Sequence, residues 1–114
     1  MRNYWIAVVR PDDYRPETVE DGAMRREIGR LNDEMVAAGV RVFVGGLQPL
    51  SAARTVRTRP GGAVVVEEGP CAAAGHHVGG FWVLRLASLD EALEWGRKAA
   101  LACRAQIEVR AFHE

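Results

Sequence analysis

The sequence predicts an α+β domain in which helices pack against one antiparallel sheet. Two observations lead to this class. Apolar strand-like runs alternate with amphipathic helical segments, and two strand-like segments adjoin in the middle of the chain. The chain has 114 residues, of which 48% are hydrophobic, and this is enough for a core without metals or disulfides. We therefore expect residues 1–114 to form a single domain.

The first half of the chain predicts a strand, a helix and a second strand. Residues 4–9 form an aromatic and branched run that is typical of a buried strand. The next segment repeats apolar residues at helical spacing, and Pro16 or Thr18 is expected to begin this helix. Gly39 stands where a left-handed cap residue ends a helix, and residues 40–44 follow as a strand. The apolar repeat consists of Met24, Ile28, Leu31 and Met35.

The second half repeats this order. Residues 81–86 are apolar and predict a strand, and residues 106–112 alternate as a half-buried strand does. Between them, Ser88 and Glu91 match a capping box, in which the serine hydroxyl accepts a hydrogen bond from the Glu91 amide. This motif predicts the first turn of a second helix.

A β-hairpin is inserted between the two halves. Residues 54–58 and 63–67 flank the Gly61-Gly62 turn. Without this insertion the order is β-α-β-β-α-β, the ferredoxin-like arrangement, in which both helices cover one face of an antiparallel sheet.

The other face of such a sheet also needs a cover. The predicted strands carry more large apolar side chains than one face can bury. An uncovered apolar face predicts association, and a two-fold homodimer with the two sheets facing each other is the simplest solution. The side chains concerned are Tyr4, Trp5, Phe43, Phe81 and Trp82.

Composition excludes several classes of partner. Fifteen basic residues balance fifteen acidic ones, so no electrostatic attraction to nucleic acid or to an anionic membrane is expected. No signal peptide and no membrane-spanning run is recognisable, and Cys71 and Cys103 form no disulfide pattern. These features predict a cytoplasmic protein. The glycine pairs lack the Lys-Ser/Thr partner of a phosphate loop, and we expect no cofactor.

The segment from Glu67 to Phe81 resembles the signature of the YCII-related (DGPF) family, with Gly69-Pro70 and Gly79-Gly80-Phe81 at the family spacing. The resemblance extends over nearly the whole chain, through residues 45–49, 89–95 and 107–110. It implies a dimeric α+β barrel with a cleft in each protomer and acid–base groups around that cleft. By position, Glu68 occupies the family's Asp site, Cys71 its Phe site and Ala73 its Glu site.

The candidate catalytic residues are His76 and Glu68. Histidine titrates near neutral pH, and a neighbouring carboxylate would orient the ring. Adjacent residues on extended backbone point in opposite directions, and the family alignment favours His76 over His77 as the residue in the cleft. The alternative is an exposed loop that contains two histidines. The adjacent histidines lack the spacing of zinc motifs, so no metal site is expected.

Three further residues are candidate ligand-binding groups: Gln48, Cys71 and His77. Gln48 would donate to a ligand carbonyl or else cap its own loop. Cys71 would be a nucleophile if it lay near His76, or else a small buried side chain.

Two functions remain open from the sequence. One is acid–base chemistry on a small molecule, by elimination or isomerisation, in a cleft near His76. The other is a non-catalytic ligand-binding or interaction module. The resemblance is compatible with the second function because such domains occur beside sigma-factor-like transcription regulators.

Overall fold

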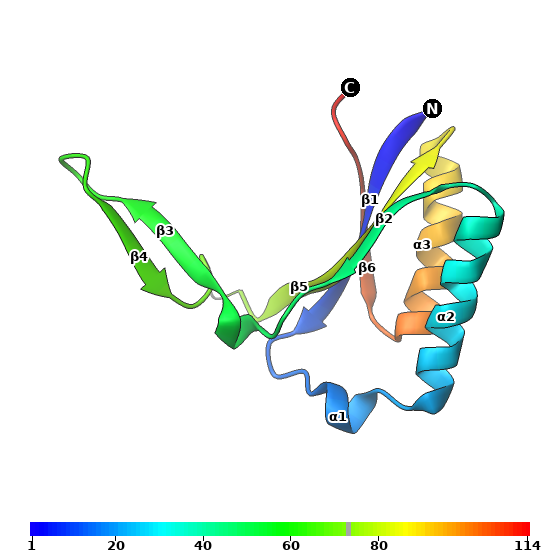
Figure 1. Ribbon diagram of the computed structural model, residues 1–114, viewed down its shortest axis with the longest axis horizontal. Helices are drawn as coiled ribbons and strands as arrows, with labels where there is room; N and C mark the ends of the chain where they lie inside the picture. The colour runs from blue at the N-terminus through cyan, green and yellow to red at the C-terminus, as the bar shows by residue number, and fades with distance from the viewer. Residues whose placement is uncertain (73) are drawn as a thin grey trace.

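The strands and helices follow one another in the predicted order (Figure 1). The computed structural model describes residues 1–72 and 74–114, so Ala73 and the family position assigned to it lie outside the described residues. The elements are β1 (Arg2–Pro11), α1 (Pro16–Val19), α2 (Gly22–Ala37), β2 (Arg41–Gly46), the 3₁₀ turn η1 (Leu50–Ala52), β3 (Arg54–Thr58), β4 (Val64–Glu68), β5 (His76–Leu86), α3 (Leu89–Cys103) and β6 (Gln106–Ala111).

Four strands form an antiparallel sheet in the order β2-β5-β1-β6, and β3 pairs only with β4. The two long helices, α2 and α3, lie side by side on one face of the sheet (Figure 1). This arrangement confirms the predicted ferredoxin-like α+β fold with an inserted hairpin. None of the helices in the described residues is long and apolar enough to cross a bilayer.

The core lies between the sheet and the two helices. Alternate side chains of β1 and β5, such as Ile6 and Leu84, point toward the helices and are fully buried. Leu31 and Met35 of α2 belong to the same buried cluster, at positions that the helical repeat predicts, and Met24 of that repeat is also buried. Gly96 lets α3 approach β6 closely, since a Cβ at that position would lie 3.0 Å from a methyl group of Val109.

The helix expected from Pro16 or Thr18 is divided into two. α1 ends at Val19, and α2 begins at Gly22 because Asp21 caps it, accepting a hydrogen bond of 2.8 Å from the Met24 amide. The hydrogen bond to Asp21, together with one from Arg104, lowers the pKa of this carboxyl. The division places the short α1 at the end of the sheet, apart from the helical layer (Figure 1).

The capping box at the start of α3 is confirmed. The Ser88 hydroxyl accepts from the Glu91 amide at 3.2 Å. The Glu91 carboxylate accepts from the amide of Ala87 at 3.0 Å, one residue before the N-cap.

β5 begins at His76, five residues earlier than the sequence predicts. Gly79 and Gly80 therefore lie within a strand and do not bracket a loop. Gly80 is needed for close pairing of β5 with β2, since a Cβ there would stand 2.9 Å from the carbonyl oxygen of Gly45.

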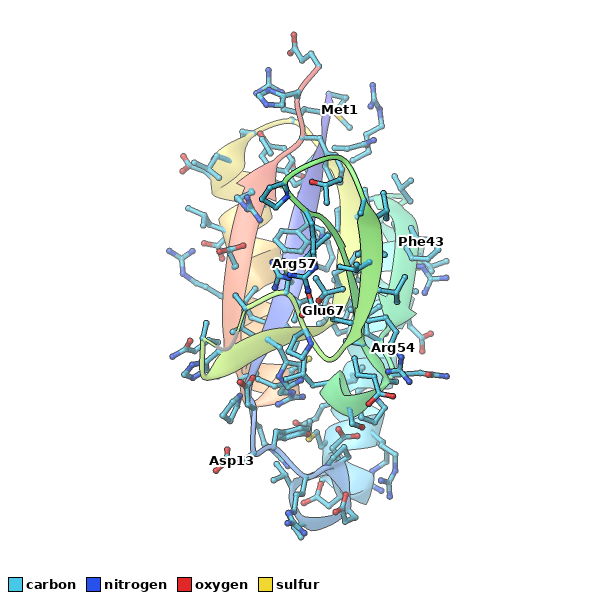
Figure 2. All side chains as sticks on the ribbon, turned by 90° about the vertical axis from the view of Figure 1, so that its left-hand side faces the viewer. Met1, Asp13, Phe43, Arg54, Arg57 and Glu67 are labelled. Atoms are coloured by element: carbon cyan, nitrogen blue, oxygen red, sulfur yellow. The ribbon has the colours of Figure 1, made fainter. Side chains whose placement is uncertain are left out.

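The hairpin of β3 and β4 extends away from the sheet as an arm (Figure 1). The Cα radius of gyration is accordingly 16.3 Å, whereas a compact chain of this length has about 13 Å. In the view of Figure 2 the arm lies in front of the helix-free face of the sheet, with Arg57 and Glu67 paired at 2.6 Å on one side of it. Its other side presents three valines that are more than 60% exposed: Val56, Val64 and Val66.

The helix-free face of the sheet carries an aromatic cluster. The Phe81 ring lies 6.2 Å from the Trp5 ring and 5.8 Å from the Phe43 ring, measured between centroids. Tyr4 and Trp82, in contrast, are buried under the helices. The large apolar side chains are thus divided between the two faces, and Phe43 remains 54% exposed.

Candidate functional site

A hollow of ≈ 360 Å³ lies at the end of the sheet where β1 finishes and β5 begins. α1 and the segment from Leu47 to Ser51 form its other walls. The amide of Leu47 donates to the carbonyl of Gly79 at 2.8 Å, which ties this segment to β5. Seven polar or charged side chains line the hollow: Arg10, Asp12, Tyr14, Glu20, Gln48, Ser51 and His77.

His77 and Asp12 form a pair within this hollow. The Nδ1 atom of His77 lies 2.9 Å from Oδ1 of Asp12, and the two side chains are 18% and 31% exposed. An ionised carboxylate can only accept a hydrogen bond, so Nδ1 carries the hydrogen. Nε2 is then the ring nitrogen that holds the lone pair in the neutral imidazole and is left for another partner.

Asp12 lines the hollow, whereas its neighbour Asp13 is exposed and points away from the domain (Figure 2). The backbone holds Asp12 in place, because its amide donates to the carbonyl of Gly75 at 2.8 Å. The two ends of the pair therefore lie on adjacent, hydrogen-bonded segments, the end of β1 and the start of β5.

A β-bulge brings His77 to this side of the sheet. Val8 pairs with Gly80 and Val9 pairs with Val78, so Gly79 is an extra residue in β5. Since the bulge shifts the alternation by one residue, His77 shares the face of Arg10, its partner in the register. Without the bulge, the histidine on that face would have been His76.

Arg10 forms the buried wall of the hollow. Arg10 is 8% exposed, and its Nη1 donates to the carbonyl of Cys103 at 2.8 Å. This carbonyl belongs to the last residue of α3, where the helix dipole favours a cation. The guanidinium carbon lies 4.2 Å from the centre of the Tyr14 ring, as in a cation–π contact.

Tyr14 and Glu20 form a second hydrogen-bonded pair. The phenol donates to Oε2 of Glu20 at 2.7 Å. Burial of the phenol, together with this hydrogen bond, raises the pKa of Tyr14 to about 12. Tyr14 therefore remains a neutral hydrogen-bond donor across the physiological pH range.

The structure brings together two of the five residues that the sequence proposed. Gln48 and His77 line the same hollow. His76 is exposed. The sequence favoured His76 as the histidine in the cleft, but the bulge at Gly79 places it on the other face of β5. His77 therefore lines the hollow, whereas the sequence favoured His76 for that position.

Glu68 and Cys71 lie apart from the hollow. Glu68 is exposed at the end of β4, where it pairs in register with Arg54. Cys71 is also exposed, so it is not the small buried side chain considered above. In the described part of the chain, neither a hydrogen bond nor an ion pair joins Glu68 to His76, and their catalytic role stays a prediction.

Sequence reasoning missed five polar or charged residues of the lining: Arg10, Asp12, Tyr14, Glu20 and Ser51. A signal for Arg10 was present, because Tyr4, Ile6, Val8 and Arg10 continue one alternating face of a buried strand. A charged residue at the end of such a buried face indicates that the apolar core ends there and that a polar site begins. Within the described residues, no group of three or more His, Cys, Asp or Glu side chains could hold a metal ion.

Comparison with known proteins places the chain in a wider group. A family model described as YCII-related domain matches residues 5–113. An uncharacterized protein of Rhizobium meliloti (strain 1021) is 36% identical over 78 residues. The similar region covers 68% of this chain and 62% of that relative, so the chain matches less than two thirds of its length.

Proposed function

Because the chain belongs to the YCII-related domain family, we propose that it is an enzyme of acid–base chemistry on a small molecule, by elimination or isomerisation. His77 is the acid–base group and Asp12 is the residue that orients it. The observation that carries the proposal is the hydrogen bond of 2.9 Å between the two, inside a hollow of ≈ 360 Å³. Hollows of this size bind small molecules.

The pair supports proton transfer for a chemical reason. Asp12 fixes the tautomer of His77 and stabilises the imidazolium that forms when Nε2 accepts a proton. The side-chain amide of Gln48 in the same lining supplies hydrogen-bond donors for the oxygen atoms of a ligand. The site thus combines a base, an orienting carboxylate and neutral donors, which is what proton abstraction next to a carbonyl group requires.

The test is a screen for deuterium incorporation from D₂O into small carbonyl compounds. Wild-type protein should catalyse exchange for a subset of them, and His77→Gln should lower the rate by about 10²- to 10⁴-fold, the usual contribution of a general base. Asp12→Asn should lower it less. His76→Gln is the matched control and should keep the wild-type rate.

An exchange activity that survives His77→Gln contradicts the proposal. A chain that binds ligands but exchanges no proton would instead be a non-catalytic binding module.

We also propose that a second copy of the chain covers the helix-free face. Two apolar surfaces support this: the aromatic cluster with Phe43, and the valine side of the hairpin arm. A two-stranded hairpin has marginal stability alone, so the extended arm needs a surface to pack on. The formal net charge of zero adds no repulsion between two copies.

A further inference from the structure

We infer that the substrate of this site carries one carboxylate, which Arg10 binds. This inference rests on the proposed function, since it names the chemical class of the molecule that His77 would act on. It starts from the buried guanidinium at the wall of the hollow, a group that the acid–base pair does not use.

Arg10 is charged, buried and short of partners. A guanidinium has five N–H donors in a planar fork. In the described residues, its side chain makes one hydrogen bond, from Nη1 to the carbonyl of Cys103. That carbonyl belongs to the last residue of α3 and carries no formal charge. Buried arginines are usually paired with an anion, because an uncompensated charge in an apolar environment is costly.

The carboxylates of the same hollow are occupied by other groups. Asp12 accepts from His77, and Glu20 accepts from the phenol of Tyr14. Neither forms an ion pair with Arg10 within the described part of the chain. The guanidinium therefore keeps donors available for an anion that enters from solvent.

The lining also limits the charge of that anion. Two carboxylates face the hollow together with one arginine. Each additional negative charge on a ligand would be repelled by Asp12 and Glu20. This arrangement fits a planar monocarboxylate, which a guanidinium binds through two parallel hydrogen bonds, better than it fits a phosphate dianion.

An apolar hollow adjoins the same arginine. Its volume is ≈ 180 Å³, and it shares Arg10 and Gly79 with the larger one. Its walls include Val8, Ile28 and Val44. A ligand held at Arg10 by its carboxylate can therefore place an aliphatic or aryl body on this surface. The inferred substrate class is a small monocarboxylic acid with an apolar body.

The test compares carboxylates with neutral amides of the same shape. Phenylacetate and phenylacetamide, and butyrate and butyramide, are titrated into the protein, and binding is followed by NMR shifts of Gln48 and His77. Each carboxylate should bind about tenfold or more tightly than its amide, because a charge-assisted hydrogen bond is roughly twice as strong as a neutral one. Inorganic phosphate should bind more weakly than either carboxylate.

Arg10→Met removes the charge while keeping a long side chain, and it should abolish the preference for carboxylate. Arg25→Met is the matched control: Arg25 is an exposed arginine of α2 outside this lining, and its loss should leave the preference unchanged. The amide comparison uses wild-type protein, so it decides the question even if Arg10→Met does not fold.

Several results overturn the inference: equal binding of carboxylate and amide, no saturable binding of either carboxylate, a preference that survives Arg10→Met, or tighter binding of phosphate. His77→Gln separates this inference from the proposed function. It should retain the carboxylate preference whether or not His77 is a catalyst. A chain that prefers carboxylates but catalyses no exchange contradicts the proposed function alone.

Discussion

On the face of the sheet that α2 and α3 cover, side chains such as Ile6 and Leu84 are fully buried, whereas on the opposite face Phe43 stays 54% exposed. Both faces are built from the same four strands, and only the alternation of side chains decides which residue joins which face. The difference teaches two things. The covered face holds the fold together, and the candidate site forms where that face continues past the long helices to Arg10 and His77.

The largest expected effect is a difference in unfolding free energy between a substitution on the covered face and one on the opposite face. Leu84→Ala should cost about 2–5 kcal/mol of unfolding free energy, because it leaves a cavity in a close-packed core. Phe43→Ala should cost less than about 1 kcal/mol in the isolated protomer, since an exposed side chain loses little on truncation. Urea denaturation at low protein concentration measures both, and equal costs would contradict the assignment of faces.

Assembly is the next comparison. If a second copy covers the helix-free face, Phe43→Asp should shift the protein from dimer to monomer, because a charge without a partner in an apolar interface is strongly unfavourable. Leu101→Asp places the same charge at a 78% exposed position of α3 and should leave the mass unchanged. Light scattering at micromolar concentration reports the mass. A wild-type chain that is wholly monomeric there would refute the dimer.

Two adjacent glycines of β5, Gly79 and Gly80, should differ in the stability that is lost when each is replaced by alanine. Gly80→Ala pushes a Cβ to 2.9 Å from a backbone oxygen of β2, and should cost about 1–3 kcal/mol as overpacking does. Gly79→Ala brings a Cβ to 3.2 Å from the side-chain Cγ of Arg10, which can move. This second change should cost less stability but weaken carboxylate binding. Thermal denaturation and ligand titration together distinguish the two; a larger stability loss from Gly79→Ala would contradict the register.

The smallest expected effect is a difference in reactivity between the two thiols. Cys71 is exposed, Cys103 is buried at the C-terminal end of α3, and burial raises the pKa of the Cys103 thiol. A raised pKa means less thiolate at a given pH, so Cys103 should react with Ellman's reagent far more slowly than Cys71 at pH 8. Denatured protein should give two thiols with or without reductant. Loss of both thiols without reductant would reveal a disulfide.

Much of the fold could be predicted from local patterns. The helical repeat around Leu31, the capping box at Ser88 and the Gly61-Gly62 turn each depend on neighbours in sequence, and each has its expected structure. The division of the first helix was not predicted, although Asp21 followed by Gly22 is a recognisable cap. It was missed because the apolar repeat does not itself mark the N-terminus.

The candidate site was harder to predict because it depends on register. Adjacent histidines in a strand must face opposite ways, but a bulge decides which one faces the core. The bulge at Gly79 arises from the pairing of β5 with β1 and leaves no local signature beyond the glycine itself. The partner Asp12 is 65 positions from His77, a separation that a single sequence does not bridge.

The central claim is that Asp12 orients His77 and not His76. Long-range ¹H–¹⁵N spectra of the imidazole rings, with His76→Gln and His77→Gln used for assignment, test it most directly. At a pH where the rings are neutral, His77 should carry its hydrogen on Nδ1, and Asp12→Ala should shift that tautomer while leaving His76 unchanged. A His77 ring that does not respond to Asp12→Ala, or a His76 ring that does, would contradict the account.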